Sequence, residues 1–207
     1  MKTAIALVSW VFMLAVALAW GPALALDNAL GLYYDDGASV DEIEISPNST
    51  HTLYLILLNP VNENFDGGGI RDVDYVWGFE CAIQPPSGDI LLNVTFPTPT
   101  INIGNTDNIV AGFQNAVPVS GQRAAMLATF NVLTMGNNPT GYRLVPTVTP
   151  SIPNAMAYVD FDDFEDPEGN LVDMVPASGS HDRPVFTFGD YTLEQAQAWG
   201  AVKALYR

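Results

Sequence analysis

The sequence predicts an all-β protein, a single antiparallel β-sandwich at residues 26–190, followed by a short C-terminal α-helix in a tail at 191–207. Two observations carry this prediction. Short apolar or alternating runs are separated by clusters of Pro, Gly and Asn, which is the pattern of strands joined by turns. Helical periodicity is almost absent before the tail, where the sequence Thr-Leu-Glu-Gln from Thr192 to Gln195 forms a capping box that begins a helix.

Residues 1–25 predict a secretory signal peptide. Lys2 supplies the positive charge, residues 4–19 are apolar, and the tripeptide Ala23-Leu24-Ala25 matches a cleavage site. The alternative is an uncleaved membrane anchor, but the apolar run is short for a bilayer and is broken at Trp20-Gly21-Pro22. We therefore expect a secreted protein, extracellular or periplasmic, with no membrane span after cleavage.

The first half of the mature chain supplies five predicted strands. They are residues 30–34, 43–45, 50–58, 74–83 and 90–96. Within the third strand, residues 53–58 are apolar on both faces, which suits a strand in the middle of a sheet.

The strand at 74–83 has the clearest alternation. One face holds Trp77, Phe79, Cys81 and Ile83, and the other holds Val76, Gly78, Glu80 and Ala82. We expect the first set in the core. The strand at 90–96 places Ile90, Leu92, Val94 and Phe96 together on one face. Turn residues at 84–89 predict that these two strands pair as a hairpin.

The second half continues the pattern of short strands. A weak strand signal at 108–113 is followed by clear or short runs at 123–133, 142–145, 155–159, 171–175 and 185–188. After residues 142–145, Pro146, Pro150 and Pro153 interrupt any long strand. Many short strands at this spacing favour one sandwich domain.

The charge of the chain excludes some partners. Seven Lys and Arg face 23 Asp and Glu, which gives a formal net charge of −16, and loss of Lys2 with the signal makes it one unit more negative. A phosphate backbone needs cations on the protein, so we expect no nucleic-acid partner. Cys81 is the only cysteine, so no internal disulfide can form, and its place on an aromatic strand face predicts a buried, inert thiol.

The densest acidic run lies at 160–170. Carboxylates and carbonyls on a loop are the ligands that Ca²⁺ prefers. The candidate calcium ligands are Asp160, Asp162, Asp163, Glu165 and Asp166. The segment is not an EF-hand, because Phe164 occupies a position that needs an oxygen ligand. The alternative is a solvated acidic loop without metal.

The tail carries large apolar residues at helical spacing. Trp199, Val202 and Tyr206 recur every three or four positions, and Lys203 and Arg207 suit the end of a helix. One interpretation is a helix packed on the sandwich. The other is a docking segment, in which these three residues anchor the chain on a partner or in self-assembly.

Catalytic motifs are missing from the sequence. Ser178, His181 and Asp182 are neighbours in sequence, whereas the members of a triad converge from separate elements. A glycosidase needs only two facing carboxylates, and Glu80 is a candidate as the one acid within its strand. We expect Glu80 to be exposed on the outer face, opposite the core aromatics, and we predict no enzyme activity.

Three segments resemble the cohesin-like and carbohydrate-binding-like β-sandwich modules of exported bacterial proteins. They are Leu53-Tyr54-Leu55-Ile56-Leu57-Leu58-Asn59-Pro60, Val76-Trp77-Gly78-Phe79-Glu80-Cys81-Ala82-Ile83 and Met126-Leu127-Ala128-Thr129-Phe130-Asn131-Val132. The resemblance covers about residues 52–160 and implies an Ig-like or cohesin-like fold without catalysis that engages protein or glycan partners outside the cell. It assigns no site residue.

These observations predict a secreted or cell-surface, non-catalytic β-sandwich protein with a binding or structural role, whose partner is an unknown protein or polysaccharide and which calcium stabilises. Two alternatives stay open. One is an extracytoplasmic carbohydrate-active hydrolase that uses paired carboxylates. The other is a subunit of a surface layer or filament, in which the tail docks on a neighbour.

Overall fold

The structure is a computed structural model that describes residues 26–44, 48–63, 69–135, 140–160 and 171–189. Within these ranges the chain forms β-strands, turns and loops and no helix. The all-β prediction is therefore confirmed for the described residues. The predicted signal peptide and the predicted C-terminal helix both lie outside them.

The described residues form fourteen strands. They are β1 (Ala29–Tyr33), β2 (Glu42–Ile43), β3 (Ser49–Leu58), β4 (Val61–Asn62), β5 (Arg71–Asp72), β6 (Tyr75–Gln84), β7 (Ile90–Thr95), β8 (Thr100–Asn102), β9 (Asn108–Pro118), β10 (Ala124–Thr134), β11 (Thr140–Val145), β12 (Met156–Val159), β13 (Leu171–Pro176) and β14 (Phe186–Phe188). Most of the predicted strands are present, and the segment at 97–107, for which no strand is predicted, contains β8.

Twelve of the strands belong to one large sheet, and β4 and β5 form a separate two-stranded ribbon. The main path runs β2-β14-β11-β6-β12-β13-β1-β3-β10-β7, with β9 beside β6 and β8 beside β9. The prediction of a purely antiparallel fold is wrong, because β1 pairs with β13 in parallel and β14 pairs with β2 in parallel. Residue alternation reveals that a strand has a buried face but not the direction of its neighbour.

The predicted hairpin between β6 and β7 is also wrong. β7 pairs with β10, while β6 pairs with β9 along one edge and with β11 and β12 along the other. Both edges of β6 are thus occupied by strands that come later in the chain. The turn residues at 84–89 therefore carry the chain out of one part of the sheet and into another.

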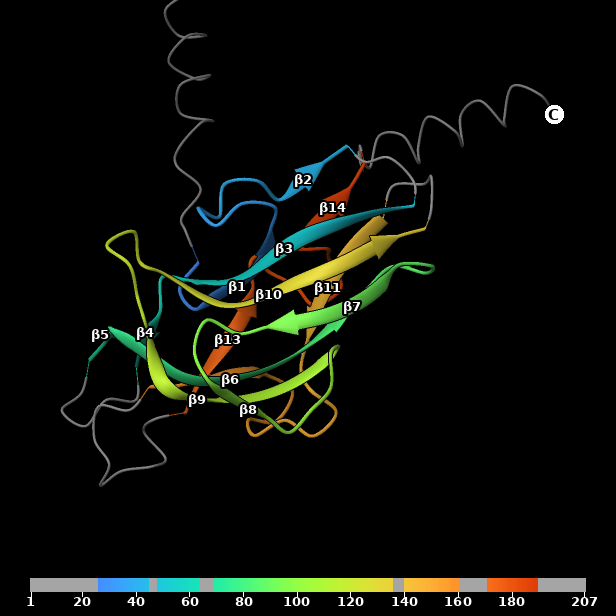
Figure 1. The fold of residues 1–207 in the computed structure, drawn as a ribbon. Coiled ribbons are helices and arrows are strands. Elements are labelled where there is room, and N and C mark those ends of the chain that lie inside the picture. Colours follow the sequence, from blue (N-terminus) through green and yellow to red (C-terminus); the bar gives the residue numbers. More distant parts are fainter. Residues whose placement is uncertain (1–25, 45–47, 64–68, 136–139, 161–170, 190–207) are drawn as a thin grey trace, which may run out of the picture.

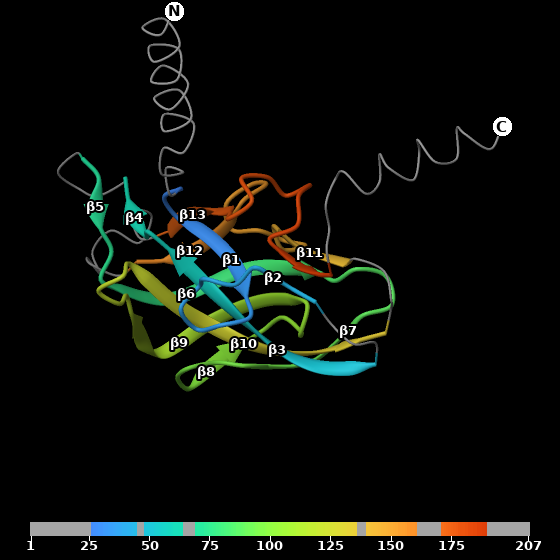
Figure 2. The same cartoon turned by 90° about the horizontal axis from the view of Figure 1, so that it is seen from above.

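The sheet folds over so that two groups of strands face one another across a common core. Figure 1 shows β3, β10 and β7 above β6, β9 and β8. Figure 2 shows, from above, β1 lying beside β13, the pair that connects the two groups. Leu53 and Leu55 of β3 and Phe130 of β10 join Phe79 and Cys81 of β6 in a single buried cluster.

A β-bulge shifts the register of β6 against β9 between Val76 and Gly78. Phe79, Cys81 and Ile83 are buried as predicted, but Val76 takes the core position and Trp77 is only half-buried. The prediction that Trp77 belongs to the core face is therefore wrong, because a bulge adds one residue and reverses the alternation before it. A Cβ on Gly78 would lie 2.6 Å from the Ala111 carbonyl oxygen, so the bulge requires glycine there.

Cys81 is fully buried, and burial raises the pKa of its thiol, with Glu80 adding to the effect. The prediction that the thiol is buried is confirmed, and its lack of reactivity stays a prediction. Since the thiolate is the reactive form, we expect native protein to resist a thiol reagent such as DTNB, and unfolded protein in urea to react completely. Rapid labelling without denaturant would contradict this placement of Cys81.

Candidate functional site

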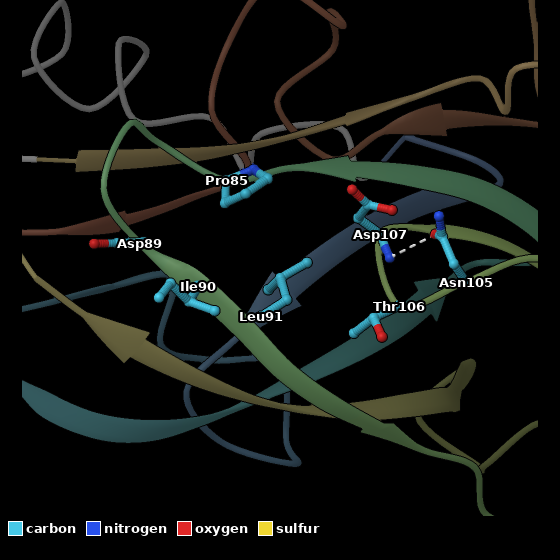
Figure 3. A pocket seen from close by; sticks show the side chains of 7 residues that line it. All are labelled: Pro85, Asp89, Ile90, Leu91, Asn105, Thr106 and Asp107. Atoms are coloured by element: carbon cyan, nitrogen blue, oxygen red, sulfur yellow. Dashed lines mark hydrogen bonds between the residues drawn. The ribbon is translucent and has the colours of Figure 1, made fainter.

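The candidate site is a hollow of about 380 Å³ at one end of β7. It is lined by Pro85, Asp89, Ile90, Leu91, Asn105, Thr106 and Asp107. Figure 3 shows β7 running along one side of it and the loop that carries Asn105 and Asp107 on the other side. Its volume lies at the small end of the range for ligand pockets.

The hollow lies between two edges of the sheet. Within the described residues β7 pairs only with β10, and β8 pairs only with β9. Each strand therefore has one edge whose backbone groups are outside the ladder, and such an edge is a template for pairing with another polypeptide.

Asp89 is buried and holds one wall of the hollow in place. Its Oδ2 accepts a hydrogen bond of 2.8 Å from the Tyr142 hydroxyl, and its Oδ1 accepts one of 3.2 Å from the Met135 amide. Burial and then the Asp89 carboxylate raise the pKa of Tyr142. The first residue before β7 is thereby tied to β11 and to the end of β10.

Side-chain amides shape the opposite wall. Asn105 Oδ1 accepts hydrogen bonds from the amides of Asp107, at 3.1 Å, and of Asn108, at 2.7 Å. Asn102 Oδ1 does the same for Gly104 at 3.0 Å. These Asx turns fix the loop and leave the Asp107 side chain exposed at the rim of the hollow. No Lys or Arg is among the lining residues.

Four large aliphatic side chains on β7, β8 and the residue after β8 are exposed near these edges. Ile90 and Leu92 are 48% and 50% exposed, and Ile101 and Ile103 are 75% and 79% exposed. We call these four residues the aliphatic rim. The prediction that Ile90 and Leu92 share a face with Val94 and Phe96 is wrong, because a register shift in the pairing of β7 with β10 falls between Leu91 and Asn93. Leu91, Val94 and Phe96 pack against the core instead.

A second hollow, of about 440 Å³, adjoins β8 and β9. Thr100 and Ile101 line it from β8, and Gly112 and Gln114 line it from β9. Ile101 and Gly112 are register partners, and nothing lies within 4 Å of the place where a Cβ on Gly112 would be. The missing side chain leaves open, apolar space beside Ile101.

The predicted calcium ligands are only partly described. Asp160 is buried, forms an ion pair with the Arg71 guanidinium, and accepts a hydrogen bond of 3.0 Å from the Asn62 side-chain amide. Its carboxylate ties the residue after β12 to the β4–β5 ribbon. Asp162, Asp163, Glu165 and Asp166 lie outside the described residues, so calcium binding there stays a prediction.

Glu80 is buried, so the prediction that it is exposed on the outer face is wrong. Its Oε1 accepts a hydrogen bond of 2.6 Å from the Ser151 amide, and its Oε2 accepts one of 2.9 Å from the Ser151 hydroxyl. Ser151 belongs to the connection between β11 and β12, which covers this side chain. Glu80 therefore holds a loop, and its carboxylate is withdrawn from the surface where a sugar would bind.

We expect Glu80→Ala to lower the free energy of unfolding by about 1–3 kcal/mol, because two hydrogen bonds to a buried, charged carboxylate would be lost. Ser151→Ala removes the hydroxyl but keeps the hydrogen bond from the main-chain amide to Glu80, so it should lower the free energy of unfolding by less. Urea unfolding of both variants measures the difference. Equal stability of Glu80→Ala and wild type would show that the carboxylate does not hold the loop.

The two histidines, His51 and His181, both contact residues of the sheet. His181 Nδ1 lies 2.8 Å from the Leu144 carbonyl oxygen, and the Ser178 hydroxyl donates to the carbonyls of Ser180 and Arg183. His51 Nε2 lies 2.6 Å from Ser49 Oγ, and its ring is 5.0 Å from that of Phe188.

Partial burial lowers the pKa of His51, and the Asp89 charge opposes that shift. The unfolded chain then binds a proton more readily than the folded one, so stability is complete above the ordinary pKa of histidine, about 6.5, and falls as the pH drops through the lowered value. We expect His51→Gln to flatten this slope in urea melts between about pH 5 and 7.5. An unchanged slope would contradict the assignment.

The predicted docking residues Trp199, Val202 and Tyr206 lie outside the described residues. The aliphatic rim, in turn, was missed from the sequence. The available signal was the isolated triplet Ile101-Asn102-Ile103 within a polar, Pro-rich segment, where two aliphatic residues alternate with an amide.

Comparison with known proteins gives no relative. No family model, no curated protein and no solved structure matches the chain. Across the described ranges, no three or more His, Cys, Asp or Glu side chains gather in a way that would hold a metal ion. No helix in that part of the chain is long and apolar enough to span a membrane.

Proposed function

We propose that this chain is a secreted or cell-surface, non-catalytic β-sandwich protein of the Ig-like or cohesin-like kind, and that it binds a polypeptide partner at the hollow and the aliphatic rim. The observation that carries the proposal is the coincidence of four exposed aliphatic side chains with the open edges of β7 and β8. The two facing groups of strands with a common core support the sandwich.

A protein partner is favoured over a glycan by the chemistry of the rim. Sugar recognition on a sheet surface uses the faces of aromatic rings, whereas Ile90, Leu92, Ile101 and Ile103 are aliphatic. Open strand edges offer main-chain hydrogen bonds to an extended peptide, and alternate side chains of that peptide then enter neighbouring hollows. Both features are present on this side of the molecule.

The test is a selection of displayed random peptides on the purified protein. We expect enriched peptides to bind wild type and to lose at least about tenfold in affinity for Ile101→Lys/Ile103→Lys, since a charge in an apolar contact is costly. Ile70→Lys, at an exposed apolar residue beside β5, is the matched control and should bind as wild type does.

Equal binding of the selected peptides to the rim variant and to wild type would overturn the proposal. A second result would also overturn it. If wild-type protein bound insoluble polysaccharides and the rim substitutions abolished that binding, the surface would belong to a glycan.

A further inference from the structure

We propose that residues 198–207 of the same chain occupy the hollow and the aliphatic rim, so that the tail covers this binding surface until a partner displaces it. The inference rests on the proposed function, because both assign a role to one surface. Three observations lead to it: where the chain leaves the described structure, the charge of the segment, and the size of the hollow.

The chain leaves the described structure close to the hollow. Phe188, the last residue of β14, packs edge-on against Tyr142 with ring centroids 5.6 Å apart. The Tyr142 hydroxyl donates to Asp89, which lines the hollow. Two side chains therefore separate the end of β14 from the site. Nine residues lie between Gly189 and Trp199, and an extended chain covers about 3.3–3.6 Å per residue, so the segment can reach the hollow.

The segment complements the charge of the site. Residues 198–207 contain Lys203 and Arg207 and no Asp or Glu, which makes this stretch basic in a chain whose net charge is −16. The hollow is lined by Asp89 and Asp107 and by no cation, and Asp107 is exposed at its rim. Opposite charges of this kind fix the orientation of a docked segment more than they add to its affinity.

The size of the hollow suits one large anchor with a flat apolar surround. Its volume of about 380 Å³ is too small for a whole helix, whereas the indole of Trp199 can enter it. Val202 and Tyr206 lie three and seven positions further on, a spacing that predicts one helical face, and that face would lie over the exposed Ile101 and Ile103. Apolar anchors ringed by less critical contacts are typical of such interfaces.

A tether to its own site favours docking within one molecule. A short linker gives the attached segment an effective concentration on the order of millimolar, well above that of a second copy in dilute solution. Docking within one chain should therefore be independent of protein concentration, whereas docking between copies should not.

Hydrogen–deuterium exchange of the purified protein tests the inference. In wild type we expect the amides of β7 and of residues 105–107 to exchange about tenfold more slowly than in Trp199→Ser/Val202→Ser/Tyr206→Ser, at every concentration between about 1 and 50 μM. Ile103→Lys changes the aliphatic rim instead of the tail, and it should speed exchange in residues 198–207. A charge exchange, Asp107→Lys with Lys203→Asp, should restore protection that each single substitution weakens. Circular dichroism establishes that each variant is folded.

Identical exchange in wild type and the triple variant would overturn the inference. Protection that rises with concentration, together with a dimer in size-exclusion chromatography, would overturn docking within one chain and assign the contact to a second copy. If exchange is identical while Ile101→Lys/Ile103→Lys still abolishes binding of selected peptides, the proposed function stands and only the inference fails.

Discussion

Replacing Asp160 with leucine should lower the free energy of unfolding by about 3 kcal/mol, the lower end of the loss for a buried ion pair, because the carboxylate is buried whereas the Arg71 guanidinium is partly exposed. The Arg71 guanidinium would lose the carboxylate that faces it, and the Asn62 amide would lose an acceptor. The ribbon formed by β4 and β5 would then be released from the start of the acidic segment. Urea unfolding followed by circular dichroism measures the loss.

The matched comparison is the double variant Asp160→Leu/Arg71→Met. Because it removes both charges, it leaves no guanidinium without its carboxylate, and the transfer of two ions out of water no longer has to be offset. It should therefore be more stable than Asp160→Leu alone. Strict additivity of the two single substitutions would show that Asp160 and Arg71 do not interact energetically. An unchanged stability of Asp160→Leu would contradict the contribution of this ion pair to stability.

Phe79→Ala should cost about 3–5 kcal/mol, because it opens a cavity in the middle of the core. The Phe79 ring lies 5.9 Å from that of Phe113 and 6.3 Å from that of Phe96, so two aromatic contacts disappear with it. Phe79 lies on β6, Phe113 on β9, and Phe96 just beyond β7. The substitution therefore weakens the contact between the two groups of strands.

Tyr75→Ala on the same strand is the control, since the Tyr75 side chain is 55% exposed and its loss should change the stability by about 0.5 kcal/mol or less. Both variants are compared by their midpoints in urea at constant slope. A smaller effect of Phe79→Ala than of Tyr75→Ala would mean that the faces of β6 are assigned the wrong way round.

Alternation of residues was enough to predict most of the longer strands and part of the core. Phe79, Cys81 and Ile83 are buried as their spacing indicates, and residues 53–58 lie in a strand with neighbours on both sides. Trp77 departs from its predicted place because of a bulge. A bulge depends on how two strands meet, and this information is not present in the sequence of one of them.

For the same reason, the local sequence pattern could not predict which strands pair or where the candidate site lies. Glu80 is buried because a connection some seventy residues later in the chain lies over it and supplies the Ser151 hydrogen bonds. The hollow forms where residues 85–91 meet residues 105–107, and only the arrangement of the whole sheet brings these segments to its two open edges. A run of aliphatic residues gives no sign of which of them face solvent.

The parallel pairing of β1 with β13 has a consequence for the order in which this protein folds. β1 lies between β3 and β13, and Ala29 is the register partner of Val175, so one side of an early strand stays without its neighbour until a late segment arrives. The chain must lose the entropy of closing a long loop before such distant segments gain any contact energy. Folding dominated by contacts of this kind is slow. The sheet therefore cannot close around β1 until the segment near Val175 is available to pair with it.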